Sequence, residues 1–198
     1  MTDQLVLPTR ERLLRAAQEL IEDGGYGAAS VVAIAEHAGV AAGTLYRHFE
    51  SKERLFVELF RAICKREERA MRAAAAAIDS APVVARLEAV LGTFAERALG
   101  NPRLAWALIA EPVDPQVDAE RLAYRERYAA LVAEELRAGI ASGELPAQNV
   151  ELTAAALVGG CGEALVGPLS RTRAGARASD AQIVAALRSF VRRAVGAA

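Results

Sequence analysis

The stretch that decides the fold is Val40–Phe56, which reads VAAGTLYRHFESKERLF. Between Thr44 and Lys52 it holds hydroxyl groups, an imidazole and cationic side chains, with a single acid, Glu50, among them. If Leu45 faces a core, its neighbours on the same helix point outward. Hydroxyl and imidazole groups donate hydrogen bonds to phosphate oxygens, and arginine neutralises them. The stretch therefore predicts a helix that presents a polar face to a groove lined by phosphates.

Two short helices meet at a tight turn just before this face. Ser30 can cap a helix over residues 31–38, and Gly39 suits the turn because glycine readily adopts a positive φ. The small side chain of Ala35 lets the next helix, over residues 41–48, approach closely. This order of elements predicts a helix-turn-helix.

The rest of the chain has the periodicity of helices. Apolar residues recur about every 3.6 residues, and the two-residue alternation of strands is missing. Thr9 is the expected N-cap of a first helix that stops at Gly24, and Ser51 is the expected N-cap of a fourth that extends to Ile78. Proline and glycine divide the remainder into helices at about 83–99, 103–110, 116–142, 149–166 and 179–195, with a mobile connector at 171–177. The predicted fold class is all-α, with about nine helices.

Composition argues against several classes of function. Hydrophobic residues make up 53% of the 198 residues and charged residues 25%, which suffices for a buried core. The formal net charge of -1 gives no general sign of a nucleic-acid partner. The first residues lack the apolar core of a signal peptide, so we expect a cytoplasmic protein without membrane association.

Chemistry-bearing motifs are scarce. Cys64 and Cys161 lack metal-ligand spacing and are expected to be small core or interface residues. The chain has two histidines, and it contains no hydrolase, zinc-protease or phosphate-loop motif. We therefore expect no enzyme activity, catalytic residue, metal or cofactor.

The segment Ser30–Phe56 resembles the DNA-binding region of the TetR/AcrR family of bacterial transcriptional regulators. Its residues match the family pattern G-V-x-x-G-T-L-Y-x-H-F-x-S-K-E-x-L at every named position. The resemblance implies a helix-turn-helix DNA-binding domain over residues 1–54. It also implies a helical effector-binding and dimerisation domain over residues 55–198.

The resemblance also implies roles for single residues in binding double-stranded operator DNA. Side chains expected at the phosphates are Ser30, Tyr46, His48 and Lys52. Positions expected nearest the bases are Ala42, Gly43 and Thr44. The side chain of Ala42 offers no polar group for base recognition, so Arg47 is the candidate to supply one.

The function implied is that of a ligand-responsive DNA-binding transcriptional regulator. We expect a repressor that a mostly apolar small molecule releases from a pseudo-palindromic operator. An activator and a ligand-independent regulator are the alternatives, and a helical oligomer without DNA binding is a remote one. The fourth helix, which starts at Lys52 beside the DNA, is the expected lever between ligand and DNA.

A symmetric homodimer is expected because one helix-turn-helix reads only half of such an operator. The helices at 149–166 and 179–195 are the expected interface. The first offers the small residues Gly159 and Gly160, and the second offers Ile183, Leu187 and Phe190. Both helices also fit an alternative role, which is to close the core of one chain.

The ligand pocket is expected to use amphipathic aromatic residues of the second domain. The candidates are Phe94, Trp106, Tyr124 and Tyr128, with Glu111 and Glu163 as polar anchors. Ordinary core packing is an equal alternative for the aromatic residues. Glu163 lies among apolar residues, so burial would require a partner such as Arg97, a cationic ligand or a second subunit.

Overall fold

The computed structural model describes residues 7–170 and 178–196, and these residues form helices and no strand. The helices are α1 (Thr9–Gly24), α2 (Val31–His37), α3 (Gly43–His48), α4 (Lys52–Ala76), α5 (Val83–Gly100), α6 (Pro102–Ile109), α7 (Pro115–Ser142), α8 (Val150–Leu169) and α9 (Asp180–Ala194). A short 3-10 helix, η1 (Tyr26–Ala28), follows α1. The predicted all-α class with about nine helices is therefore confirmed for the described residues. The predicted connector at 171–177 lies outside them.

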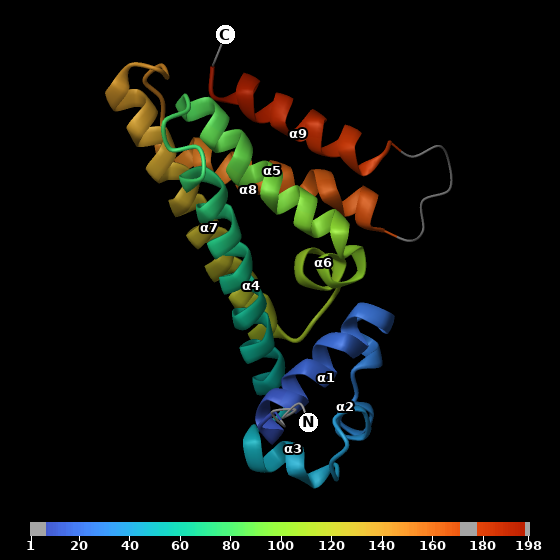
Figure 1. Ribbon diagram of the computed structural model, residues 1–198. Helices are drawn as coiled ribbons and strands as arrows, with labels where there is room; N and C mark the ends of the chain where they lie inside the picture. The colour runs from blue at the N-terminus through green and yellow to red at the C-terminus, as the bar shows by residue number, and fades with distance from the viewer. Residues whose placement is uncertain (1–6, 171–177, 197–198) are drawn as a thin grey trace, which may run out of the picture.

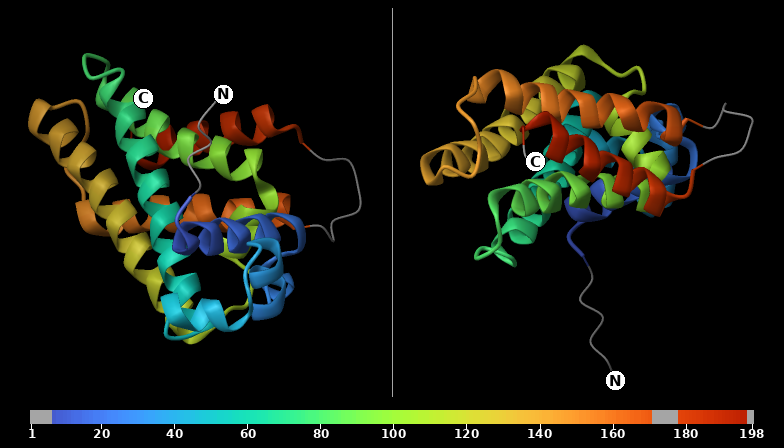
Figure 2. Two further views of the ribbon diagram at one scale, coloured as in Figure 1. Left: turned by 60° about the horizontal axis from the view of Figure 1, so that its bottom comes forward. Right: turned by 90° about the horizontal axis from the view of Figure 1, so that it is seen from above.

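The helices form a small unit and a larger one (Figure 1). Helices α1, η1, α2 and α3 pack together at one end, and we call them the reader. Helix α4 rises from the reader and packs against α5 and α7 of the larger bundle. Helix α6 lies between the bundle and α1, and it contacts α1. Helices α5, α8 and α9 lie at the end far from the reader (Figure 1), and the view from above in Figure 2 shows the red helix α9 running alongside its neighbours.

Side-chain caps fix two of the helix starts near the reader. The Ser30 hydroxyl accepts a hydrogen bond from the Ala33 amide at 3.1 Å, and the Ser51 hydroxyl accepts one from the Arg54 amide at 3.2 Å. Both caps agree with the sequence prediction. The predicted Thr9 cap is wrong, because Thr9 is already the first helical residue of α1, whose N-cap position makes no side-chain hydrogen bond.

Several helix bounds differ from the sequence prediction, and the three largest differences are two or three residues. Helix α3 begins at Gly43 rather than Ala41, because the preceding turn is tight: the Thr44 amide donates to the Ala41 carbonyl at 2.8 Å. Helix α4 ends at Ala76 instead of Ile78. Helix α8 continues to Leu169 although Pro168 lies inside it. Since proline removes a single backbone donor there, the last turn survives its loss.

One hydrophobic core runs through both units. It includes Leu13 and Leu45 in the reader and Leu87 and Leu136 in the larger bundle, all without exposed surface. The predicted domain boundary at residue 54 falls inside α4, which passes from the reader into the bundle without a break. The division into two domains therefore stays a prediction.

Helix α8 is mostly apolar, and its two charged residues are Glu151 and Glu163. By length and composition it is the one described helix that meets the criterion for a membrane span, which core helices also meet. Its buried face, which includes Leu157, Cys161 and Leu165, packs into the core. The opposite face exposes Leu152 by 68%, together with Ala155, Ala156 and Gly159. We call these four exposed residues the α8 face.

Candidate DNA interface and effector pocket

The turn of the helix-turn-helix is held by backbone geometry and by one arginine. Gly39 has a φ of 65°, a conformation that suits glycine and strains other residues. Arg12 of α1 donates from Nη2 to the carbonyl oxygens of Ala38 and Gly39. This arginine therefore fixes the angle between α2 and α3. The sequence analysis missed it, because its partners are backbone atoms of a distant segment.

Helix α3 separates a buried residue from an exposed polar face. Leu45 has no exposed surface and belongs to the core, whereas the next residue, Tyr46, is 57% exposed. Arg47 and His48 are exposed as well, and Thr44 is half-buried. The expected outward face therefore exists, with Thr44 at its margin. Among the described residues, none makes a hydrogen bond or an ion pair with the side chain of Tyr46 or Arg47.

The start of α3 is open to a close-approaching partner. Ala42 and Gly43 are exposed, and a Cβ atom added at Gly43 would meet no other atom within 4 Å. Gly43 is therefore not required by packing inside the chain. Its small size instead leaves room for an external surface to approach the backbone of α3.

Lys52 lies at the first residue of α4 and leans over aromatic rings. Its ammonium nitrogen lies 5.2 Å from the ring centre of Tyr26 and 5.3 Å from that of Phe56. Such cation–π contacts restrict the lysine side chain before any partner binds. Burial, helped by the carboxylates of Asp114 and Glu53, raises the pKa of Tyr26 to about 12. The ring beneath Lys52 therefore stays neutral at physiological pH.

Ion pairs neutralise most other cations of the reader. Arg10 pairs with Glu58, and Arg15 pairs with Glu19 at 2.7 Å. Nε2 of His37, which is an exposed residue, also lies 2.8 Å from the Glu19 carboxylate. Among the described residues, Arg47 makes no ion pair or hydrogen bond. The positive charge available for phosphate is thus concentrated on Arg47 of α3 and Lys52 at the start of α4, which explains why overall charge was uninformative.

The larger bundle contains a cavity of about 780 Å³, which we call the effector pocket. Four aromatic rings from α4, α5 and α7 form a continuous part of its wall. The ring centres of Phe60 and Tyr124 are 6.0 Å apart, those of Tyr124 and Tyr128 are 6.0 Å apart, and those of Phe94 and Tyr128 are 6.1 Å apart. A pocket of this size and lining suits a drug-sized, mostly apolar molecule.

The two tyrosines tie this wall to α4. The Tyr124 hydroxyl donates to the Arg61 carbonyl at 3.2 Å, and the Tyr128 hydroxyl donates to the Cys64 carbonyl at 3.3 Å. Burial is the main cause that raises the pKa of both tyrosines. Burial also raises the pKa of Cys64 to about 12, so its thiol stays protonated at neutral pH.

Four of the six predicted pocket residues line the effector pocket, namely Phe94, Tyr124, Tyr128 and Glu163. Trp106 does not, because α6 turns Leu104, Ala105 and Leu108 toward the cavity and its tryptophan packs elsewhere on the core. Glu111 does not either, because it lies beyond the end of α6 and points toward the reader. The prediction for these two residues is therefore wrong in this structure.

Glu163 is exposed rather than buried. Arg97, its suggested partner, instead makes a bidentate ion pair with Glu67 of α4, with distances of 2.5 and 2.8 Å. The Arg97–Glu163 pair is therefore wrong. Because Glu163 keeps contact with water, it needs no buried partner, and the described residues give it none.

Arg121 and Glu111 link the effector pocket to the reader. Arg121, which lines the pocket, donates to the carbonyls of Ala107 at 2.7 Å, Leu108 at 3.0 Å and Glu111 at 2.5 Å at the end of α6. The Glu111 carboxylate then accepts the amide of Tyr26 in η1 at 3.1 Å. A short chain of hydrogen bonds thus runs from the pocket wall to the reader.

The predicted dimer residues fall into two groups. Gly159 and Phe190 are exposed, and Gly160 lies under Phe190, whose ring a Cβ atom at Gly160 would meet at 3.4 Å. Ile183 is half-buried against the core. Leu187 is only 5% exposed, so it belongs to this chain's own core, as the alternative proposed. Leu187 therefore has almost no surface left for a partner.

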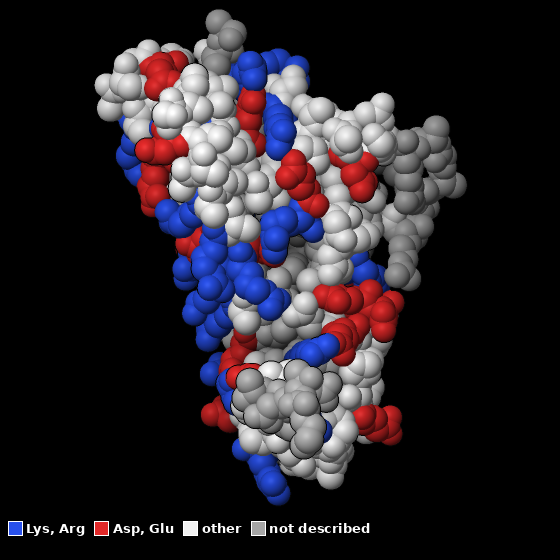
Figure 3. Space-filling model, viewed as in Figure 1, with Lys and Arg blue, Asp and Glu red and all other residues white. Residues whose placement is uncertain are grey.

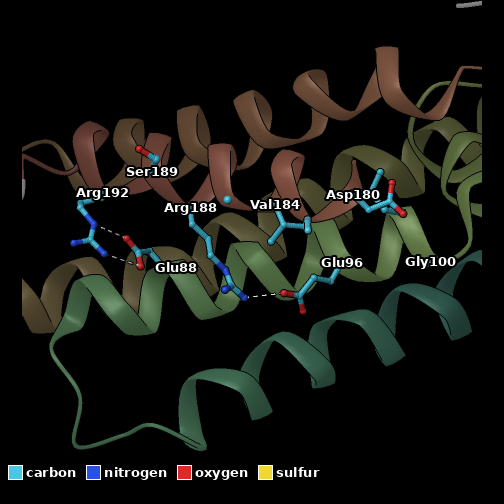
Figure 4. A pocket seen from close by; sticks show the side chains of 11 residues that line it. Glu88, Glu96, Gly100, Asp180, Val184, Arg188, Ser189 and Arg192 are labelled. Carbon is cyan, nitrogen blue, oxygen red and sulfur yellow. Dashed lines mark hydrogen bonds and ion pairs between the residues drawn. The ribbon is translucent and has the colours of Figure 1, made fainter. Parts of the chain in front are cut away.

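A second hollow, of about 730 Å³, lies between α5 and α9 (Figure 4). Arg188 of α9 pairs with Glu96 of α5 at 2.8 Å, and Arg192 pairs with Glu88 at 2.8 Å. Opposite charges in this groove are thus largely matched within the chain. We interpret the groove as the seam that holds α9 on α5.

Comparisons with known proteins agree with this architecture. Residues 13–59 match the model of bacterial regulatory proteins of the tetR family, and residues 80–165 match that of the tetracyclin repressor-like C-terminal domain. The chain is 29% identical over 186 residues to the HTH-type transcriptional regulator UidR of Escherichia coli strain K12, covering 93% of this chain and 91% of that one.

Two solved structures share the fold along almost the whole chain. Transcriptional regulator FadR from Bacillus subtilis in complex with stearoyl-CoA is 23% identical, with a TM-score of 0.77 over 95% of this chain and 98% of that one. RolR in complex with resorcinol is 18% identical, with a TM-score of 0.71 over 96% of this chain and 88% of that one. The two family models, together with the helix-turn-helix and its exposed α3 face, show that this chain belongs to the TetR family of transcriptional regulators.

Proposed function

We propose that this regulator is a repressor that two copies of the chain place on a pseudo-palindromic operator and that a mostly apolar ligand releases. The observation that carries the proposal is the division of α3, where Leu45 is buried while Tyr46, Arg47 and His48 face outward. A buried residue fixes the helix, and the exposed donors that directly follow it remain for DNA. Action on operator DNA places the protein in the bacterial cytoplasm.

The proposed contacts divide into positioning and reading. Hydroxyl, imidazole and ammonium groups of Ser30, Tyr46, His48 and Lys52 bind phosphates and set the register. The open start of α3, at Ala42, Gly43 and Thr44, lies nearest the base edges. Arg47 supplies the long polar side chain that Ala42 lacks, and it reaches a phosphate or a guanine.

The α8 face supports a homodimer. Its exposed apolar surface continues to Phe190 of α9 and is the kind of patch that a second copy covers. Two readers joined this way reach two half-sites about one helical turn apart. Ala156→Arg places a charge on the exposed α8 face and is expected to give a folded monomer by light scattering. Ala73→Arg, at an exposed site on α4, is the matched control and stays dimeric.

The effector pocket supports control by a small molecule. FadR from Bacillus subtilis was solved with stearoyl-CoA and RolR with resorcinol, and both proteins share this fold. The aromatic wall of this chain fits a ligand with a large apolar part. A ligand that presses on Tyr124 or Tyr128 acts on α4 directly through their hydrogen bonds. A ligand that moves Arg121 acts on α6 and, through Glu111, on the reader.

Only a ligand that binds the two conformations unequally changes operator affinity. The test begins with a thermal-shift screen of apolar metabolites and drugs, followed by anisotropy titration of each hit against labelled operator. We expect hits that stabilise the protein to release the DNA. Hits that stabilise the protein and leave operator affinity unchanged contradict ligand control. In vitro transcription from the operator distinguishes repression from activation.

A further inference from the structure

We infer that the effector pocket takes an amphipathic anion, whose acidic head group lies at the α4 mouth beside Arg66 and whose apolar part lies against the aromatic wall. This inference rests on the proposed ligand control and names the chemical class of the ligand. It is carried by the charges that remain unmatched around the pocket, which are mostly positive, whereas the groove between α5 and α9 leaves only the acid Asp180 unmatched among its described lining residues.

Two of the four arginines that line the pocket are already engaged. Arg97 is neutralised by the bidentate pair with Glu67. Arg121 donates hydrogen bonds to the carbonyls at the end of α6 and to the Asp118 carboxylate at 3.3 Å. These two arginines therefore build the wall and leave little positive charge for a ligand.

The other two arginines have no carboxylate partner among the described residues. Arg66 donates to the neutral amide oxygen of Gln18 at 2.9 Å, and Arg125 makes no hydrogen bond or ion pair there. Both are exposed, so water now solvates their charge. An acidic head group would replace that water and gain a charge-assisted hydrogen bond. Glu163 is the single unmatched acid of the lining, so positive charge prevails.

The surface outside the pocket continues this positive charge along α4. Lys65 and Arg69 are exposed next to Arg66, and Arg69 donates from Nε to the Lys65 carbonyl at 3.2 Å rather than to an acid. The acids of the same stretch face other helices, since Glu68 pairs with Arg127 at 2.9 Å. Figure 3 shows Lys and Arg side chains gathered over the middle of α4. A head group with several negative charges thus meets cations beyond the mouth.

The apolar part of the pocket lining has the character of a site for an apolar tail. Phe60, Phe94 and Val166 line it, and the tyrosine hydroxyls on the wall already donate to α4. A ligand without an apolar part would leave this wall unfilled, and a cationic ligand would meet Arg66 at the mouth. The combination favours a chain or ring system that carries a carboxylate or phosphate at one end.

The test compares probes with one apolar chain and different head groups. Dodecanoate, dodecanoyl-CoA, dodecan-1-ol and dodecyltrimethylammonium are titrated below their aggregation limits by isothermal titration calorimetry, because the single tryptophan of the chain, Trp106, lies outside the pocket lining. We expect the anions to bind at least about tenfold more tightly than the alcohol at low salt, and the difference to shrink in salt. Arg66→Gln is expected to remove most of this preference and leave alcohol binding unchanged.

Arg137→Gln is the matched control, because it removes the same charge from an exposed site that pairs with Glu151 and lies outside the pocket. It should keep the preference for anions. Tighter binding of the alcohol or the cation, failure of every probe to bind, or an unchanged preference in Arg66→Gln overturns the inference. If the alcohol or the cation binds and releases operator DNA, the proposed function stands and only the charge class is wrong. Operator binding without probe, measured alongside, tests the DNA-binding function separately.

Discussion

The reader and the effector pocket of this protein differ in where their functional side chains lie. The reader presents exposed side chains from one short helix, and the neighbours Leu45 and Tyr46 divide packing from recognition. The pocket is assembled from several helices, and its residues, such as Tyr124 and Tyr128, belong to the core while also facing the cavity. A substitution in the reader can therefore impair DNA binding without lowering stability. A substitution in the pocket is expected to change both ligand binding and stability.

The largest expected effect tests that separation within the reader. Leu45→Ala removes a fully buried side chain and should lower the free energy of unfolding by about 2 to 5 kcal/mol. Tyr46→Ala should leave thermal unfolding unchanged, because the ring is exposed. It should weaken operator binding about tenfold or more, because the hydroxyl that is proposed to contact phosphate is lost. Denaturant unfolding and anisotropy titration measure the two effects. A Tyr46→Ala protein that binds operator like the parent would show that α3 is not the reading helix.

In the larger bundle, Arg121 is expected to join stability and control. Arg121→Met leaves the carbonyls of Ala107, Leu108 and Glu111 without their charged donor, at a cost on the order of 2 kcal/mol. It should also weaken the release of operator by ligand, because the link to α6 is lost. Arg137→Met, on the same helix and exposed, is the control and should change neither. Equal thermal stability of the two variants would contradict the structural role of Arg121.

Two glycines with positive φ allow a comparison at nearly constant backbone strain. Gly39 in the reader has a φ of 65°, and Gly143 after α7 has a φ of 80°. Alanine at either site should cost about 1 to 2 kcal/mol of stability. Operator affinity should fall further in Gly39→Ala, because Arg12 and the turn set the position of α3. Equal operator affinity of the two variants would show that the turn tolerates distortion without loss of DNA binding.

The smallest expected effect concerns pH and the contact between α4 and α7. The hydrogen bond from Arg61 lowers the pKa of Glu120, so the pair stabilises the fold above the ordinary carboxyl pKa of about 4.3. This stabilisation is lost as pH falls through the lowered pKa. The pair is partly exposed, so the gain should stay below about 1 kcal/mol. Thermal unfolding of the parent and Glu120→Gln should differ at pH 7 and converge in acid, whereas a constant difference would exclude this pair as its cause.

The same contrast explains what could be predicted from sequence. Caps such as Ser30 and Ser51, the turn at Gly39 and the outward face of α3 depend on residues close in the chain, and they were predicted correctly. The pocket depends on how distant helices rotate against one another. Trp106 and Glu111 were misplaced for that reason, since neither their periodicity nor their chemistry tells which neighbour α6 will face.

The sequence also could not predict which acid or carbonyl each arginine contacts. Arg97 joins Glu67 rather than Glu163, and Arg12 joins backbone carbonyls. Each arginine had several acids or carbonyls within reach in principle, and tertiary packing selected among them. Fold class needs only the period of the apolar residues, whereas a pocket needs the rotation of every helix.

The central claim is that two readers, joined through the larger bundle, recognise a symmetric operator. Selection of the full-length protein against random duplex DNA, followed by sequencing of the bound fraction, tests it most directly. The account predicts enrichment of inverted repeats whose half-sites lie about 10 base pairs apart, and loss of that enrichment in Tyr46→Ala. Absence of enrichment, or enrichment of a single half-site without symmetry, would contradict it.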